Sequence, residues 1–277
     1  MQSIRKQHKS HIGVFDSGFG GIHVLRGIVR VLPEYDYIYV GDTARTPYGT
    51  RSPEVVYEFT RQAVEFLFAN GCELVVLACN TASSDALRKI QQEYLPKHYP
   101  NKRVLGVLIP AAEEAAARTK NKKVGVIATE GTVRSGAFVR ELTKIDPSVR
   151  VHQQACPLLV PIVEAGEDRS QLAQLALERY LKPVRRRGVD TLILGCTHYG
   201  ILERSIKRVM GPGVRIISES TIVPKKLRAY LARHPEIECR LSKGGTHTFY
   251  STDLTGAFSK LGSKFFGAPI EAKKITL

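Results

Sequence analysis

Short apolar runs alternate with amphipathic segments along most of the chain. Residues 11–15, 72–79 and 123–128 are largely apolar runs bounded by glycine or small polar residues. Runs of this length and composition are typical of parallel strands that are buried on both faces. The segment after Ser52 and Pro53 instead repeats apolar positions at helical spacing, and these two residues mark the start of a helix. Because strands alternate with helices, the pattern predicts parallel sheets with right-handed crossovers.

Two stretches of the chain resemble each other at a separation of 117 residues. Residues 71–81 read GCELVVLACNT, and residues 188–198 read GVDTLILGCTH. In each stretch a glycine ends a helix, an apolar strand follows, and the strand leads a cysteine, Cys79 or Cys196, into a polar turn. The carboxyl ends of parallel strands form the edge of the sheet where ligands bind. The repeat therefore predicts two thiols that reach one site from two similar halves.

A second pair of similar stretches, residues 12–18 and 124–131, has nearly the same separation. The fold that we expect is α/β with two pseudo-symmetric lobes, each an open and mostly parallel sheet flanked by helices, and with the active site in the cleft between them. The last elements have no counterpart in the second lobe and are expected to return to the first. The predicted lobes are residues 1–102 with 219–277, carrying Asp16 and Cys79, and residues 103–218, carrying Glu164, Cys196 and His198.

The composition is that of an ordinary globular protein. The chain has 277 residues, 43% of them hydrophobic, which is enough to bury a sizeable core. No apolar run reaches the roughly 20 residues of a membrane helix, and residues 1–11 lack the apolar region of a secretory signal. Five cysteines in a chain of this size favour a reduced, cytoplasmic protein. Three of them are expected to be small buried hydrophobic residues, namely Cys72, Cys156 and Cys239.

The charge of the chain suggests a nucleic-acid partner, since the net charge is +15 and the pI is near 9.7. A solvated basic surface is the simpler interpretation. No nucleic-acid-binding motif accompanies the charge, and basic runs such as residues 185–187 fall at the predicted ends of helices. The glycine-rich turn at residues 16–21 has neither the dinucleotide-binding spacing nor a complete P-loop.

Two cysteines at matched positions of a repeat indicate chemistry. A metal site would need further soft ligands, and a disulfide is unusual in a reduced compartment. A nucleophile built from Cys196 and His198 would leave Cys79 without a role, whereas two bases on opposite sides of one carbon use both thiols. A free thiol has a pKa of about 8.5 and needs assistance near neutral pH. We expect Asp16 to assist Cys79. For Cys196 we expect His198 and Glu164, whose apolar, proline-interrupted stretch suits a partly buried carboxyl with a raised pKa.

Four motifs of the chain resemble the glutamate racemase family, within the cofactor-independent aspartate/glutamate racemase superfamily. They occur in the order expected for that family, and the resemblance runs from about residue 12 to residue 266. The motifs are DSGFGG at residues 16–21, PYG at 47–49, CNTAS at 79–83 and GCTHY at 195–199.

The resemblance implies that one thiolate removes the α-proton of glutamate and the other thiol protonates the opposite face, without a cofactor or a metal. Cys79 would take the proton from D-glutamate and Cys196 from L-glutamate, with Asp16, His198 and Glu164 as catalytic partners. A cytoplasmic homodimer that supplies D-glutamate for peptidoglycan, and an anionic cell-wall precursor as its activator, are also implied. The implied substrate-binding residues are Asp16, Ser17, Pro47, Tyr48, Gly49, Asn80, Thr81, Thr129, Thr132, Thr197 and His198.

The chain departs from the family pattern at two places. Gly200 stands where proline is usual, and residues 218–220 read Ser-Glu-Ser where Asp-Ser-Ala or Asp-Ser-Gly is common. Two other functions stay open. One is a racemase of the same superfamily that acts on aspartate or another amino acid, against which residues 47–49 argue. The other is a basic protein that interacts with nucleic acid or a topoisomerase.

Overall fold

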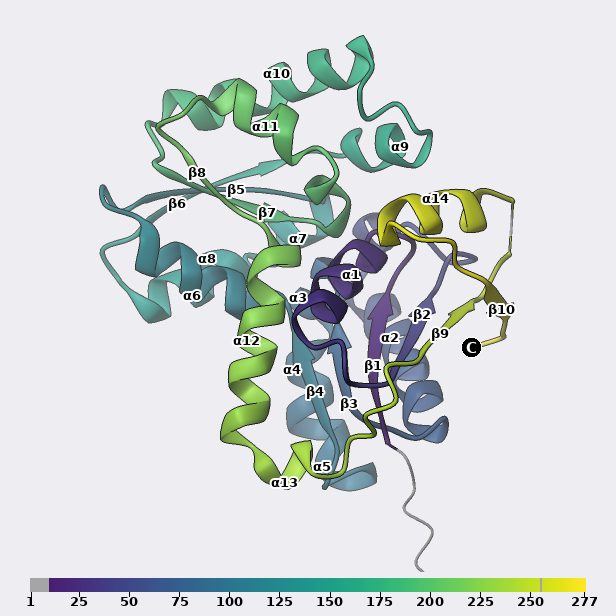
Figure 1. Cartoon of the computed structure of the whole chain (residues 1–277). Helices are drawn as coiled ribbons and strands as arrows, with labels where there is room; N and C mark the ends of the chain where they lie inside the picture. Colours follow the sequence, from purple (N-terminus) through teal and green to yellow (C-terminus); the bar gives the residue numbers. More distant parts are fainter. Residues whose placement is uncertain (1–9, 255) are drawn as a thin grey trace, which may run out of the picture.

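The structure is a computed structural model that describes residues 10–254 and 256–277. Its strands form two sheets, and helices cover the faces of both (Figure 1). All strand pairings that the described residues form within these sheets are parallel. The predicted α/β class with two lobes is confirmed. The expectation for residues 1–11 falls mostly outside the described residues.

The two sheets share one topology. The larger sheet has the strand order β10-β9-β2-β1-β3-β4, and the smaller sheet has the order β6-β5-β7-β8. Four strands of the larger sheet, β2-β1-β3-β4, therefore match the whole of the smaller one, which confirms the repeat seen in the sequence. The strands are β1 (His11–Asp16), β2 (Tyr37–Gly41), β3 (Cys72–Leu77), β4 (Arg103–Gly106), β5 (Lys123–Ala128), β6 (Arg150–Ala155), β7 (Thr191–Gly195), β8 (Arg215–Ile217), β9 (His247–Ser251) and β10 (Ala272–Lys274).

Helices connect the strands within each lobe (Figure 1). The larger lobe contains α1 (Gly21–Val31), α2 (Pro53–Ala69), α3 (Asn80–Asp85), α4 (Leu87–Lys89), α5 (Leu95–His98), α12 (Glu219–Arg233), α13 (Pro235–Glu238) and α14 (Gly256–Phe266). The smaller lobe contains α6 (Leu108–Arg118), α7 (Glu130–Ser135), α8 (Ala137–Ile145), α9 (Leu159–Glu164), α10 (Gln171–Arg186) and α11 (Glu203–Met210). None of the described helices combines the length and the apolar character that crossing a membrane requires.

The helix start and stop signals in the sequence mark the ends of helices in the structure. Ser52 caps α2 by accepting a hydrogen bond from the backbone N–H of Val55, and Pro53 is the first residue of the helix. Gly71 and Gly188 follow α2 and α10 with φ of 83° and 67°. Only glycine adopts this left-handed conformation without strain, so each helix ends where the next strand must begin.

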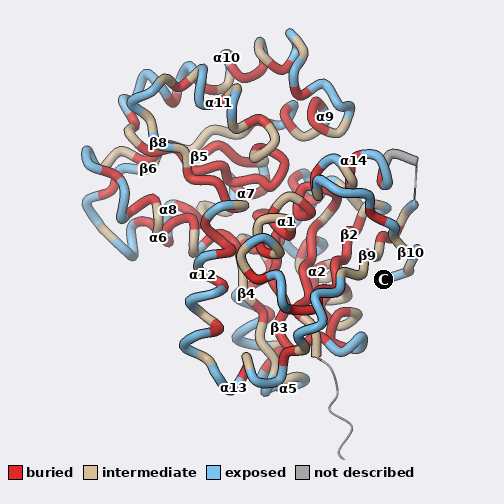
Figure 2. The backbone as a smooth tube through the Cα atoms, in the orientation of Figure 1, coloured by how far each residue is buried: buried red, intermediate tan, exposed pale blue. Residues whose placement is uncertain are grey.

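The central strands β1, β2, β3, β5 and β7 are buried on both faces, whereas the edge strands β6 and β10 are partly exposed (Figure 2). Ile12 and Val14 point into a core beneath α1, whereas Phe15 points into a second core beneath α2. In the smaller sheet, Leu192 and Ile193 point to opposite faces in the same way. The core beneath α1 continues into the smaller lobe. This burial explains why the strands read as continuous apolar runs rather than as alternating patterns.

Three details of the sequence-based description need correction. β4 pairs with β3, so residues 103–106 belong to the larger sheet and we place the crossing to the second lobe after Gly106. Cys239 is exposed, because it follows the short surface helix α13, whereas Cys72 and Cys156 are buried as predicted. The helix predicted from Ser83 or Ser84 begins at Asn80, because Cys79 caps it.

The contact between α1 and α12 leaves no room for a side chain at Gly27. A β-carbon at this position would lie 2.1 Å from the carbonyl oxygen of Ser220. Alanine favours an α-helix over glycine by about 1 kcal/mol, but overlap with a backbone atom cannot be relieved by rotating a side chain. We expect Gly27→Ala to lower the free energy of unfolding by about 1–3 kcal/mol, as overpacking does.

Urea denaturation measures this change. Gly213→Ala is the matched control, because a β-carbon there has no atom within 4 Å, and we expect a change within about 0.5 kcal/mol. A Gly27→Ala variant as stable as the original chain would contradict the described packing.

Candidate active site

The two cysteines of the repeat occupy equivalent positions in the two lobes. Cys79 follows the end of β3, and Cys196 directly follows the end of β7. Both are nearly inaccessible, with 6% and 7% of their surface exposed. Cys79 is one of the groups that raise the pKa of Cys196, after the effect of burial itself. The structure therefore brings both thiols into one electrostatic environment.

Polar contacts join the two lobes near Cys79 and Cys196. The hydroxyl of Thr197 donates to Oδ1 of Asp16 at 3.4 Å. The hydroxyl oxygens of Thr81 and Thr129 lie 3.0 Å apart. A β-carbon at Gly20 would lie 2.1 Å from Oγ1 of Thr197. The glycine-rich turn after β1 is thus needed to let the second cysteine turn approach the first lobe.

Cys79 is held by short polar contacts within the first lobe. Its thiol donates to Oγ of Ser17 at 3.4 Å, and its sulfur accepts from the backbone N–H of Ala82 at 3.5 Å. Burial raises the pKa of Cys79 to about 12, the charge of Asp16 adds to this effect, and the hydrogen bond with Ser17 opposes it. Burial of the site thus opposes formation of the Cys79 thiolate.

Asp16 is fully buried at the end of β1. It accepts a hydrogen bond from the backbone N–H of Gly18 at 2.9 Å in addition to that from Thr197. Burial raises the pKa of Asp16, and the positive charge that His198 can carry opposes this. The hydroxyl next to the Cys79 thiol belongs to Ser17. The charge of Asp16 raises the pKa of Cys79, so it opposes ionisation of this thiol in the structure, and the expected assistance of Cys79 by Asp16 stays a prediction.

Cys196 stands at the start of a thiol, imidazole and carboxylate series. Its sulfur lies 3.8 Å from Nδ1 of His198, and Nε2 of that ring lies 3.0 Å from Oε1 of Glu164. Glu164 is the last residue of α9 and is partly buried, whereas His198 is buried. Burial raises the pKa of Cys196 well above its usual value, and the backbone N–H of His198 opposes the shift. The geometry suits an imidazole that takes a proton from the thiol or returns it.

The remaining predicted binding residues are the threonines of the second lobe and the loop at residues 47–49. Thr132 joins Thr81 and Thr129 in a hydroxyl cluster, with Oγ1 3.4 Å and 3.1 Å from theirs. In the loop after β2, Gly49 packs against Thr129, because a β-carbon there would lie 2.8 Å from Cβ of that threonine.

The side chains before Gly49 have other partners. Tyr48 is buried beside the rings of Phe15 and Phe59, and its hydroxyl donates to Asp42 at 2.5 Å. Pro47 is exposed. This loop therefore meets the other lobe through the backbone of Gly49, while the Tyr48 side chain anchors the loop in the core.

One residue near the site was not identified from the sequence. Glu219, the first residue of α12, is 3% exposed and accepts a hydrogen bond from Nδ2 of Asn80 at 2.9 Å. The sequence indicated only a departure from the family pattern at residues 218–220. The carboxyl of Glu219 contacts a residue 139 positions away, and a pattern within one segment does not reveal such a contact.

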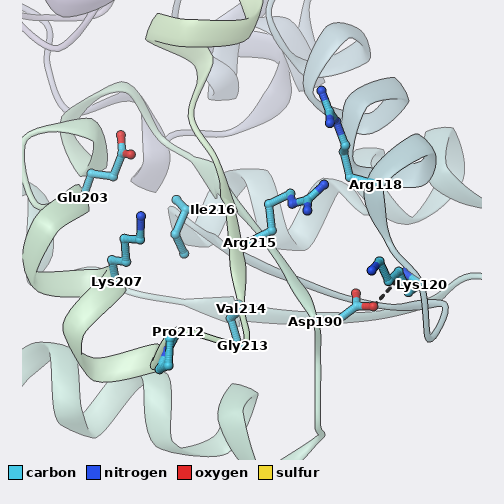
Figure 3. Close-up of a pocket in the computed structure, with 10 residues that line it drawn as sticks. All are labelled: Arg118, Lys120, Asp190, Glu203, Lys207, Pro212, Gly213, Val214, Arg215 and Ile216. Atoms are coloured by element: carbon cyan, nitrogen blue, oxygen red, sulfur yellow. Dashed lines mark hydrogen bonds between the residues drawn. The ribbon is translucent and has the colours of Figure 1, made fainter.

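The smaller lobe also has a surface pocket, which contains none of the predicted site residues (Figure 3). It has a volume of about 400 Å³ and lies beside β8. Four basic side chains line it, Arg118, Lys120, Lys207 and Arg215. The carboxylate of Asp190 in its wall already accepts from two backbone N–H groups, each at 2.7 Å. The pocket is part of the basic surface and is separate from the thiols.

The described residues contain no candidate metal site. Among residues 10–254 and 256–277, no three His, Cys, Asp or Glu side chains form a metal-binding group. A reaction without metal or cofactor stays a prediction.

The raised pKa of Cys79 can be tested directly. A thiol pKa near 12 predicts that the thiolate absorbance assigned to Cys79 does not develop below about pH 10, well above the usual range for cysteine. Asp16→Asn keeps the size of the side chain and removes its charge, so we expect the pKa of Cys79 to fall in this variant while staying above the usual value. Ultraviolet titration measures both, and Cys79→Ala identifies the step. A Cys79 thiolate at neutral pH in the unmodified protein would contradict this description of the site.

Comparison with known proteins identifies the family of this chain. The profile of the Asp/Glu/Hydantoin racemase family matches residues 12–223. A glutamate racemase of Geobacter metallireducens is 42% identical over 260 residues, which are 94% of this chain and 93% of the relative.

Two solved structures extend this comparison. A glutamate racemase isoform of Bacillus anthracis has a TM-score of 0.89 at 36% identity and covers 97% of this chain and 98% of its own. The Francisella tularensis glutamate racemase, solved in complex with D-glutamate, has a TM-score of 0.87 at 30% identity, with 97% and 98% coverage. The chain belongs to the Asp/Glu/Hydantoin racemase family.

Proposed function

We propose that this protein is a glutamate racemase that interconverts L-glutamate and D-glutamate by proton transfer between two cysteines. The observation that carries the proposal is the burial of Cys79 and Cys196 at equivalent strand ends of two facing lobes. The relatives named above, which match this chain over nearly its whole length, support glutamate as the substrate. A role in supplying D-glutamate for peptidoglycan follows from this activity.

Each turnover moves one proton off the substrate and one onto it. With D-glutamate bound, the Cys79 thiolate takes the α-proton, so the C–H bond breaks and an S–H bond forms. The Cys196 thiol then gives its proton to the opposite face of the same carbon and becomes the thiolate. L-Glutamate reacts by the reverse sequence. No other reagent is consumed, and the two cysteines have exchanged protonation states.

The difficult step is formation of the carbanion, which is a much stronger base than a thiolate. Its negative charge spreads onto the α-carboxylate, and preorganised donors are the usual means of stabilising such charge. Asn80, Thr81 and Thr197 are the residues that we propose for this role. All three are nearly buried, so their hydrogen bonds to the substrate form away from bulk water.

The helpers of the two thiols differ. We propose that His198, oriented by Glu164, accepts the proton of Cys196 and returns it. At Cys79 the hydrogen bond with Ser17 lowers the pKa of the thiol, whereas the charge of Asp16 raises it. The hydroxyl groups of Thr129 and Thr132 form the wall that the second lobe contributes to the substrate site, and Gly49 of the first lobe packs against Thr129. Tyr48 anchors the loop that carries Gly49 in the core, and Pro47 stays a predicted contact of the substrate.

Several predictions about partners stay open. A homodimer, an anionic activator and a cytoplasmic location stay predictions. The comparisons favour a racemase over a nucleic-acid-binding protein.

The two-thiol mechanism predicts the effect of removing either sulfur. Cys79→Ala and Cys196→Ala should each lower racemisation of glutamate by at least about 100-fold, the scale of general acid–base catalysis. Cys239→Ala is the matched control, because Cys239 is exposed and outside the site, and it should keep full activity. Circular dichroism follows the loss of optical activity, and thermal unfolding confirms that each variant is folded. Full activity in either site variant would refute the assignment.

Heavy water distinguishes glutamate from the rival substrate. In heavy water, L-glutamate should lose optical activity and gain deuterium at the α-carbon without any added cofactor, whereas L-aspartate should do neither. Mass spectrometry and polarimetry measure both changes. Exchange with L-aspartate alone would replace the proposed substrate, and exchange with neither would refute the proposed activity.

A further inference from the structure

The buried carboxyl of Glu219 has no role in the mechanism described above. Its Oε2 accepts a hydrogen bond from Asn80, and its Oε1 is buried without a hydrogen-bond partner among the described residues. Burying a carboxyl group with so few partners costs stability. Stability alone therefore does not explain why a glutamate occupies this position.

The partner of Glu219 is the residue that follows Cys79. Asn80 starts α3, is 2% exposed, and its Oδ1 also lacks a hydrogen-bond partner among the described residues. A side-chain amide has a donor at one end and an acceptor at the other, so its neighbours decide which end points where. In the structure Oε2 of Glu219 accepts from Nδ2, so the Oδ1 end of the amide points away from Glu219.

The surroundings of Glu219 favour an uncharged hydrogen-bond acceptor. Burial raises the pKa of Glu219 well above its usual value, the hydrogen bond from Asn80 opposes this, and the charge of Asp16 adds to it. A negative Glu219 would also oppose formation of the Cys196 thiolate. The small pocket beside Glu219 is also lined by the polar side chains of His23, Cys196, Thr197, Ser218 and Ser220. A neutral carboxyl still has a carbonyl oxygen that accepts from Asn80.

We propose that Glu219 is a positioning residue that orients the side-chain amide of Asn80 toward the substrate and holds the turn that carries Cys79. The position belongs to the Ser-Glu-Ser segment at which this chain departs from the family pattern. In Figure 1, α12 begins where the chain leaves the smaller lobe and then runs along the larger one. Glu219 therefore links the junction of the lobes to one of the two bases. The proposal rests on the function proposed above.

Two substitutions separate the hydrogen bond from the bulk of the side chain. Glu219→Gln keeps a carbonyl acceptor of the same shape, and its kcat for glutamate should stay within about 3-fold of the original. Glu219→Leu removes the acceptor and should lower kcat about 10- to 100-fold, since small misplacements at an active site have effects of this size. The two enantiomers have equal free energy, so kcat/KM should fall equally for L-glutamate and D-glutamate.

Stability provides a second measurement. Glu219→Leu removes the cost of burying a carboxyl, but it also leaves the buried Nδ2 of Asn80 without its acceptor, which costs stability. We expect Glu219→Leu to unfold at a lower urea concentration than Glu219→Gln, which keeps an acceptor for Asn80. Ser220→Ala, which changes the next residue and a different hydrogen bond, is the control and should keep both stability and activity.

A double-mutant cycle tests whether Glu219 acts through Asn80. Asn80→Ala alone should lower kcat, and adding Glu219→Leu should then change it by less than about 2-fold. Independent, multiplicative effects would overturn the proposal. So would full activity in Glu219→Leu, or equal losses in Glu219→Gln and Glu219→Leu.

A spectroscopic measurement separates this proposal from the proposed function. The side-chain N–H signal of Asn80 in ¹⁵N NMR, identified by its absence in Asn80→Ala, should be protected from solvent exchange. Protection should persist in Glu219→Gln and disappear in Glu219→Leu. If the unmodified protein fails to racemise glutamate but shows this pattern, the proposed function is wrong and the contact is right. Unprotected Asn80 in the unmodified protein would overturn the contact itself.

Discussion

The exclusion of water from two facing thiols is the constraint on which the site depends. Burial raises the pKa of both Cys79 and Cys196, and the charge of one opposes ionisation of the other. When two groups are coupled in this way, the pair releases one proton well before the second. A site with one thiolate and one thiol is what a proton transfer between opposite faces of a carbon requires. The low polarity that makes the first ionisation difficult also makes the two cysteines take different roles.

Duplicated topology supplies the required geometry. Because β2-β1-β3-β4 and β6-β5-β7-β8 share one order, the strand that leads to each cysteine occupies the same place in its sheet. The carboxyl ends of both sheets then face one space, and small residues let the turns approach. Gly20 and Gly49 admit Thr197 and Thr129 where a β-carbon would collide with them. Backbone contact thus aligns the lobes, and the hydroxyl groups between them remain available for a ligand.

The sequence predicted the features that arise from local patterns. The strands, the helix start at Ser52 and the repeat around Cys79 and Cys196 follow from apolar periodicity and from glycine, serine and proline signals. Features that depend on distant partners were missed or misplaced. β4 was assigned to the wrong sheet, because a strand carries no mark of its neighbour. Cys239 is exposed after the short helix α13, and the contact between Asn80 and Glu219 joins segments far apart in sequence.

The asymmetry of the two halves is compatible with a symmetric reaction. Cys196 has an imidazole and a carboxylate nearby, whereas Cys79 has a serine hydroxyl and a backbone N–H. Since L-glutamate and D-glutamate have equal free energies, no arrangement of helpers can shift the equilibrium between them. The helpers change only the heights of the barriers, and every barrier is shared by both directions. Each lobe can therefore activate its thiol in its own way, provided that both thiols reach the same carbon.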